Sequence, residues 1–132
     1  GLSLRREDVI NTNYKPQEAT RGVADYLKAH PPGPGSATAF LCMSDLLAVG
    51  AIEGLKAAGL RVPEDCSVTG YDGLAFTDYT APPITTVNQN IQQKGYEAAR
   101  LLWDMIAGHR PAQRLILPHT IDEKGSVGTR TP

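Results

Sequence analysis

The sequence predicts an α/β fold in which a parallel sheet is flanked by helices. Two short apolar runs, 39–43 and 67–71, have the length of buried strands, and a long apolar stretch with helix-capping signals separates them. A stretch with helical spacing, 16–30, and a strand candidate precede them. Alternating strands and helices indicate a doubly wound sheet, because two strands joined by a helix almost always form a right-handed parallel crossover.

The composition describes one globular domain. The 132 residues are enough for one domain with a real core but not for two. Hydrophobic residues make up 41 % of the chain and charged residues 20 %, and no apolar run approaches the length of a membrane span. The net charge of −1 and the scattered basic residues argue against nucleic-acid binding by this chain itself.

The first part of the chain predicts a strand and then a helix. Residues 7–13 contain a pair of β-branched residues and are the strand candidate. Pro16 suits the first turn of a helix, and apolar residues recur at helical spacing to about His30. The Pro-Pro-Gly-Pro-Gly loop at 31–35 ends this helix.

The middle of the chain predicts a strand, a helix and a second strand. Side-chain oxygens of Ser44 and Asp45 stand where the helix 46–58 begins. Gly59 suits the left-handed position that ends a helix, and a proline follows as a stop. The second strand, 67–71, closes at the dipeptide 72–73.

The last part of the chain predicts a strand at 84–87, a helix at 91–107 and a strand at 115–117. The first of these is β-branched, and Asn88 or Asn90 is the candidate cap of the helix. The remaining residues are polar and rich in glycine.

Ser44, Asp45 and Asp72 are predicted to share one edge of the sheet. Each follows or ends a strand, and parallel strands place their carboxyl ends together, where open α/β sheets bind ligands. Simpler roles compete with ligand binding. Asp72 can satisfy the backbone of its own turn, Asp45 is favoured as a helix cap over a ligand contact, and Ser44 is ambiguous for the same reason.

Cys42 and Cys66 lie in or beside predicted strands. We expect two free thiols in a reducing compartment rather than a disulfide. Neither has metal-ligand spacing with a histidine, so we expect no metal. Because the sequence begins with Gly1 rather than methionine, we expect a processed chain or a fragment, and the absence of a signal peptide says little.

Three segments together resemble the C-terminal half of LacI/GalR-family transcriptional regulators: MSDLLAVGAIEGLKAAGLRVPEDCSVTGYDG, APPITTVNQNIQQKGYEAARLL and LILPHTIDEKGS. The resemblance covers nearly the whole chain. It implies a type I periplasmic-binding-protein-like fold, of which this chain holds an incomplete C-terminal lobe. Residues 1–88 and 118–132 would belong to that lobe, and 89–117 to the other lobe, which is missing.

The resemblance also implies effector contacts. Asp72 matches the aspartate that accepts hydroxyl groups of the effector, Ser44 matches a polar contact, and Gln89 matches a polar residue of the crossover between lobes. Asp45 matches the acidic residue of the family's Asn/Ser-Asp pair, and the role that the resemblance implies for it is helix capping rather than effector contact. Lys124 replaces the usual arginine, so a bidentate contact is lost.

A dimer is the second implication of the resemblance. The family dimerises through the helix at 46–58 and the segment after Gly-Tyr-Asp, here represented by Val49, Ile52, Phe76 and Tyr79. Burial of the whole helix inside the monomer is the alternative. The apolar stripe of helix 91–107 also needs a partner, and we expect it either to fold back on the sheet or to swap into another chain.

Three functions are therefore compared. The motifs favour the effector-binding and dimerising part of a cytoplasmic DNA-binding regulator, whose DNA-binding head lies outside this chain. A periplasmic sugar-binding protein of a transport system is the alternative. An enzyme is rejected, because the chain has no nucleophile elbow, no phosphate loop and no acid cluster for Mg²⁺. The expected effector is a sugar or related polyol, with no cofactor and no membrane contact.

Overall fold

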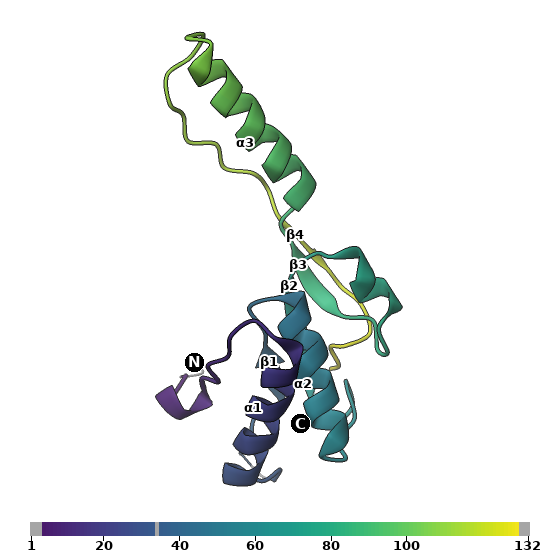
Figure 1. The fold of residues 1–132 in the computed structure, drawn as a ribbon. Helices are drawn as coiled ribbons and strands as arrows, with labels where there is room; N and C mark the ends of the chain where they lie inside the picture. The colour runs from purple at the N-terminus through teal and green to yellow at the C-terminus, as the bar shows by residue number, and fades with distance from the viewer. Residues whose placement is uncertain (1–3, 34, 130–132) are drawn as a thin grey trace.

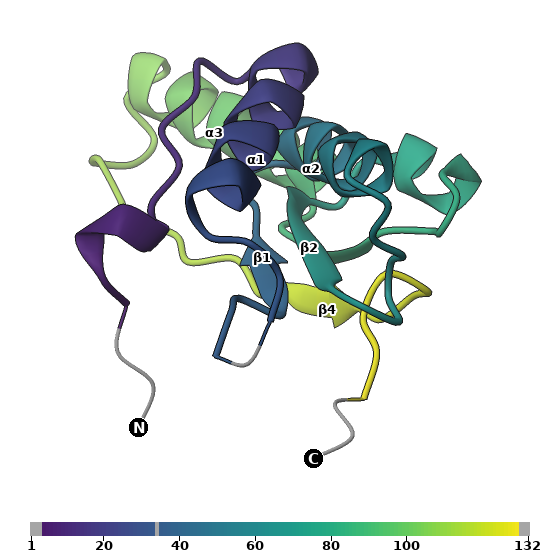
Figure 2. The same cartoon turned by 90° about the horizontal axis from the view of Figure 1, so that it is seen from below.

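A computed structural model describes residues 4–33 and 35–129. The strands form a four-stranded sheet in the order β1-β2-β3-β4. Helices α1 and α2 lie together over one face of this sheet, whereas α3 extends away from it (Figures 1 and 2). The α/β class predicted from the sequence is confirmed, with helices on one face of the sheet in the described chain.

The sheet is parallel except at its last strand. Strands β1 (Ala39–Leu41), β2 (Ser67–Asp72) and β3 (Thr85–Asn88) run in the same direction. Strand β4 (Thr120–Asp122) pairs with β3 in the antiparallel direction. The carboxyl ends of β2 and β3 therefore meet the beginning of β4 at one edge of the sheet.

Helix α2 (Asp45–Ala57) begins where the sequence predicts. Ser44 is its N-cap, because its Oγ accepts a hydrogen bond from the Leu47 amide at 3.2 Å. The helix ends before Gly59, whose φ of +79° is the left-handed conformation that the sequence predicts there.

Helix α1 (Pro16–Ala29) packs against α2 through two glycines. A Cβ atom at Gly50 would lie 2.1 Å from the Pro16 carbonyl oxygen, and one at Gly54 would lie 2.9 Å from the Thr20 carbonyl oxygen. The Thr20 hydroxyl also donates to the Gly50 carbonyl at 2.9 Å. These contacts set the two helices side by side in the same direction, at a separation that only glycine permits.

The core lies between α2 and the sheet. Its buried members come from α1, α2, β2 and the adjoining loops: Val23, Ala48, Ala51, Ile52, Leu55, Val62, Cys66, Val68 and Ile84. At β1 the other face of the sheet is open, with Leu41 81 % exposed. The expectation that the run 39–43 is a buried strand is therefore wrong in part, because β1 is an edge strand covered on one face only.

Two predicted strands are absent from the described chain. Residues 6–8 form the 3-10 helix η1 (Arg6–Asp8), which the Asp8 carboxylate stabilises by accepting from the Arg5 side chain and backbone. Residues 115–117 belong to no helix or strand, and no strand of the described chain pairs with them. Strand β4 follows instead, at a position that the sequence does not predict.

Helix α3 (Ile91–Ile106) has no buried residue. It leaves the sheet after β3, and the chain returns along it to β4, so that α3 extends beyond the edge of the sheet (Figure 1). The expectation that this helix folds back on the sheet is wrong. Strands β3 and β4, which precede and follow α3, hold both ends of the segment 89–117 at the same edge of the sheet. We call this segment the α3 arm, and its exchange with another chain stays a prediction.

Candidate functional site

Polar side chains converge at the carboxyl edge of the sheet. Ser44 follows β1, Asp72 ends β2 and pairs in register with Asn88 at the end of β3, and Asn88 pairs with Thr120 of β4. Gln89 begins the connection to α3. The predicted edge therefore exists, and of the side chains proposed as ligand contacts it brings Asp72 and Gln89 into direct contact.

Asp45 is fully buried and serves the structure. Its Oδ2 accepts from the Leu74 amide at 2.7 Å, and its Oδ1 accepts from the Thr86 hydroxyl at 2.5 Å. With 0 % exposure it offers no surface to a ligand, and Ser44 rather than Asp45 is the N-cap of α2. The expected capping role is thus corrected, and we leave Asp45 out of the proposed ligand contacts.

Ser44 is 7 % exposed, and its hydroxyl oxygen already serves the cap of α2. The hydroxyl hydrogen is left to donate, since the cap uses only the oxygen as an acceptor. Ser44 therefore suits one hydrogen bond to a ligand at the rim of the site.

Asp72 is the most unusual residue at this edge. Its φ is +129°, a left-handed value at which a non-glycine residue costs about 1–3 kcal/mol and persists only if its surroundings fix it. The side chain is half-buried, and its Oδ1 accepts from Gln89 Nε2 at 2.7 Å. Backbone strain at a sheet edge, together with a carboxylate that stays partly accessible, is typical of a binding position.

Gln89 connects Asp72 to helix α3. Its Nε2 donates to Asp72, while its Oε1 accepts a short hydrogen bond from Lys94 Nζ. The amide is thereby oriented from both sides, with its donor facing the carboxylate. Lys94 was missed in the sequence, where an exposed lysine in the first turns of a polar helix gives no signal.

A second polar pair joins β3 to β4, the strands before and after α3. Asn88 Nδ2 donates to Asp122 Oδ2 at 2.9 Å, and Asn88 Oδ1 accepts from the Asn90 amide at 2.9 Å. Asn90, with a φ of +48°, caps α3 by accepting from the Gln93 amide. The direction in which α3 leaves the sheet is therefore set by side chains of the same edge.

Tyr14 is the third residue of the described chain, other than glycine, with a positive φ, here +53°. It precedes α1 and is 69 % exposed. Since α1 runs in the same direction as α2, the loop that holds Tyr14 lies on the side of the sheet from which α2 begins. An exposed aromatic in a strained loop on this side suits contact with a flat or apolar face of a ligand.

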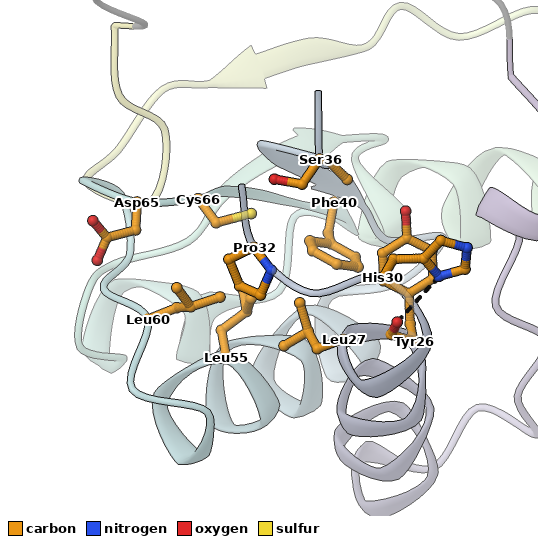
Figure 3. Close-up of a pocket in the computed structure, with 11 residues that line it drawn as sticks. Tyr26, Leu27, His30, Pro32, Ser36, Phe40, Leu55, Leu60, Asp65 and Cys66 are labelled. Carbon is orange, nitrogen blue, oxygen red and sulfur yellow. Dashed lines mark hydrogen bonds between the residues drawn. The ribbon is translucent and has the colours of Figure 1, made fainter. Parts of the chain in front are cut away.

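A small cavity of about 30 Å³, shown in Figure 3, lies elsewhere. It is lined by the ends of α1 and α2 and by the residues that lead into β1 and β2, among them His30, Phe40 and Cys66. This volume is about that of one water molecule. We regard the cavity as a packing gap at the opposite edge of the sheet, not as a ligand site.

The two cysteines are free thiols with no nucleophilic role in the structure. Burial raises the pKa of Cys42 to about 12 and the pKa of Cys66, which Asp65 also raises, to about 11. Both thiols therefore stay protonated at neutral pH. Among the residues that the structure describes, no group of three or more metal-ligating side chains comes together.

The proposed dimer residues differ in exposure. Tyr79, at the end of the 3-10 helix η2 (Ala75–Tyr79), is 88 % exposed, whereas Phe76 and Val49 are partly buried. Ile52 is only 3 % exposed and belongs to the core. Ile52 is therefore already packed inside the single chain, and α1 covers Gly50 and Gly54 of α2.

The topology defines a class of protein: an α/β domain with a mixed sheet whose polar carboxyl edge adjoins the connection to α3. The chain belongs to the periplasmic binding protein-like domain family, whose model matches residues 2–127. The resemblance to LacI-family regulators is confirmed by its relatives.

The HTH-type transcriptional repressor PurR of Erwinia tasmaniensis is 35 % identical over 128 residues, which are 96 % of this chain and 36 % of that protein. The structure of a LacI family transcriptional regulator from Enterococcus faecium with bound ribose superposes with a TM-score of 0.82 at 29 % identity, covering 92 % of this chain and 44 % of the other. A structure of the transcriptional regulator CelR in complex with cellobiose superposes with a TM-score of 0.85 at 31 % identity. The match covers 95 % of this chain and 37 % of the CelR chain.

The chain spans 23–36 % of the length of the PurR proteins that it matches. These relatives are transcriptional repressors. No helix in the described part of the chain is long and apolar enough to cross a membrane.

Proposed function

We propose that this chain is the C-terminal part of the effector-binding domain of a LacI-family transcriptional regulator and supplies one wall of the effector site. The observation that carries the proposal is the hydrogen bond from Gln89 to Asp72, which joins the end of β2 to the connection that leads into α3. A ligand that contacts both side chains would sense the position of the α3 arm relative to the sheet.

The proposed effector is a sugar or a related polyol. A half-exposed carboxylate accepts hydrogen bonds from hydroxyl groups, and the Gln89 amide beside it and the Ser44 hydroxyl at the same edge of the sheet add donors. Two of the structural relatives hold ribose and cellobiose. The chemistry of the edge suits such ligands, which present several hydroxyl groups within a short distance.

We also propose that the chain divides into two parts. Residues 4–33, 35–88 and 118–129 build or adjoin the sheet, whereas 89–117 form the arm with α3. We propose that this arm belongs to a second lobe. Effector binding between the lobes would favour one relative position of the arm, which is a population shift, provided that the two positions differ in affinity.

We propose a homodimer as the second property of the intact protein, with Val49, Phe76 and Tyr79 at the interface and no contribution from Ile52. DNA would be bound by a domain outside this chain, since the chain has a net charge of −1 and scattered basic residues. The proposed protein is a cytoplasmic regulator, not an enzyme, and needs no cofactor.

A nuclear magnetic resonance titration of this chain tests the effector proposal. Ribose, cellobiose and lactose are added separately, and we expect one of them to shift the amide signals of Ser44, Asp72 and Gln89. The variant Asp72→Asn should abolish these shifts, because an amide replaces an acceptor by a donor. The matched control Glu53→Gln, on the exposed face of α2, should retain them. Unchanged spectra with all three sugars would refute binding of ribose, cellobiose and lactose at this wall of the site.

A further inference from the structure

The turn that follows Asp72 is fixed from inside the protein by a buried carboxylate and a buried hydroxyl. Asp45 is 0 % exposed and Thr86 is 1 % exposed. The Leu74 amide donates to Asp45 Oδ2 at 2.7 Å, and the Gly73 amide donates to Thr86 Oγ1 at 3.3 Å. Since Thr86 Oγ1 itself donates to Asp45 Oδ1, one carboxylate fixes both amides that follow Asp72.

Gly70 makes room for the Asp45 carboxylate because it has no side chain. A Cβ atom at Gly70 would lie 2.3 Å from Asp45 Oδ1, so a side chain at position 70 would displace the carboxylate. A buried carboxylate is tolerated only where hydrogen bonds replace water, and here both oxygens have a donor. The start of α2 does not require it as a cap, because Ser44 already provides one.

We propose that Asp45 is a positioning residue of the ligand edge: through Leu74 and Thr86 it fixes the turn that presents the Asp72 carboxylate to Gln89 and to an effector. The strained φ of +129° at Asp72 needs such support, because a non-glycine residue keeps this conformation only where neighbours determine it. The role toward an effector rests on the proposed function, whereas the role toward Gln89 does not.

The variants Thr86→Val and Thr86→Ser separate this role from simple packing. Valine removes the hydroxyl at similar volume, and serine keeps it. Amide exchange is measured over the whole chain. Thr86→Val removes the acceptor of the Gly73 amide and the donor to Asp45, and exchange at Gly73 should speed up about fivefold. Exchange in Thr86→Ser should stay within about twofold of the original. The amide of the buried Val68 in β2, which donates to the Ser126 carbonyl at 2.9 Å, is the reference away from this turn.

The side-chain amide signals of Gln89 report the position of Asp72 directly. We expect them to move in Thr86→Val and in Asp45→Asn, and to return to their original positions in Thr86→Ser. Asp45→Asn is the second variant, in case valine at position 86 prevents folding. Unchanged Gln89 signals in a folded variant would overturn the positioning role, as would equal acceleration at Gly73 and Val68.

Ribose then separates this inference from the proposed function. If the original chain binds ribose, we expect the Kd for ribose to rise about tenfold in Thr86→Val, because the Asp72 carboxylate would no longer be oriented toward the sugar. The Kd should return to its original value in Thr86→Ser. An unchanged Kd would overturn positioning toward the effector. If the original chain does not respond to ribose, that result counts against the sugar proposal, and the Gln89 signals alone decide the positioning role.

Discussion

Lys124 reaches from the segment after β4 to Asp78 of η2, with its Nζ 2.5 Å from Asp78 Oδ1. The same nitrogen donates to the buried Thr77 hydroxyl at 2.8 Å, and the lysine side chain is only 18 % exposed. This contact attaches the last part of the chain to the segment proposed for dimerisation. A lysine makes it as a single point of charge, where the resemblance would expect a bidentate arginine.

We therefore expect Lys124→Met to lower the free energy of unfolding by about 1 kcal/mol, mainly through the hydrogen bond to Thr77. Asp78 is largely exposed and should add little. The measurement is urea denaturation followed by circular dichroism. In the control Lys28→Met, the ion pair between Lys28 and Asp25 is lost. Both of these side chains are well exposed, so the free energy of unfolding should fall by less than about 0.5 kcal/mol. Equal costs for the two variants would contradict the assignment.

Gly50→Ala tests the contact between α1 and α2. The added methyl group would lie 2.1 Å from the Pro16 carbonyl oxygen, so α1 must move. We expect a loss of about 1–3 kcal/mol in the free energy of unfolding, as for overpacking elsewhere. The matched control is Gly95→Ala on α3, where nothing lies within 4 Å of the new atom. It should be neutral or should stabilise the helix by up to about 1 kcal/mol.

Local signals predict most elements of this fold. The caps and stops around α2, the proline that opens α1 and the β-branched run of β3 act over a few residues, so they can be identified in the sequence. Strand β4 is different, because Thr120–Asp122 is a strand only through its hydrogen bonds to β3. Its residues carry no periodic pattern of their own.

The site was predicted less completely, for a related reason. The edge follows from the order of strands and helices, so the positions of Ser44 and Asp72 were predictable. The role of Asp45 was not, because an acid at the start of a helix gives the same sequence signal as a cap. Only the tertiary contacts with Leu74 and Thr86 distinguish a buried acceptor from a cap.

The stability of the chain should fall below pH 4, in part through Asp65. Hydrogen bonds from the Arg61 side chain and backbone lower the pKa of Asp65 from 3.8 to about 2. Since the pKa is lower in the folded chain, this contribution is present above pH 3.8 and is lost as the pH falls through about 2. Asp65→Asn should remove that part of the pH dependence. Urea midpoints between pH 2 and about pH 6 measure it, and identical slopes in both proteins would contradict the prediction.

Tyr79→Arg tests the proposed dimer without disturbing the core. The tyrosine is 88 % exposed in the single chain, so the monomer should fold normally. Exposed aromatic residues contribute much of the energy of an interface, and we expect the dimer Kd to rise about tenfold or more. Sedimentation equilibrium of a chain that contains both lobes is the measurement. Tyr14→Arg, at an exposed tyrosine on another element, is the control and should leave the dimer intact.

Trp103 reports the fate of the α3 arm. It is the only tryptophan of the chain and is 69 % exposed, like Leu102 and Ile106 beside it on an arm without a buried residue. An apolar surface of this kind favours association, and we expect two chains to exchange or pair their arms. Its fluorescence emission should therefore move to shorter wavelength, and acrylamide quenching should fall, as the protein concentration rises. Ile106→Lys should prevent both changes. A quenching constant that is the same at every concentration would show that the arm stays in water, and the expected exchange of arms would then be wrong.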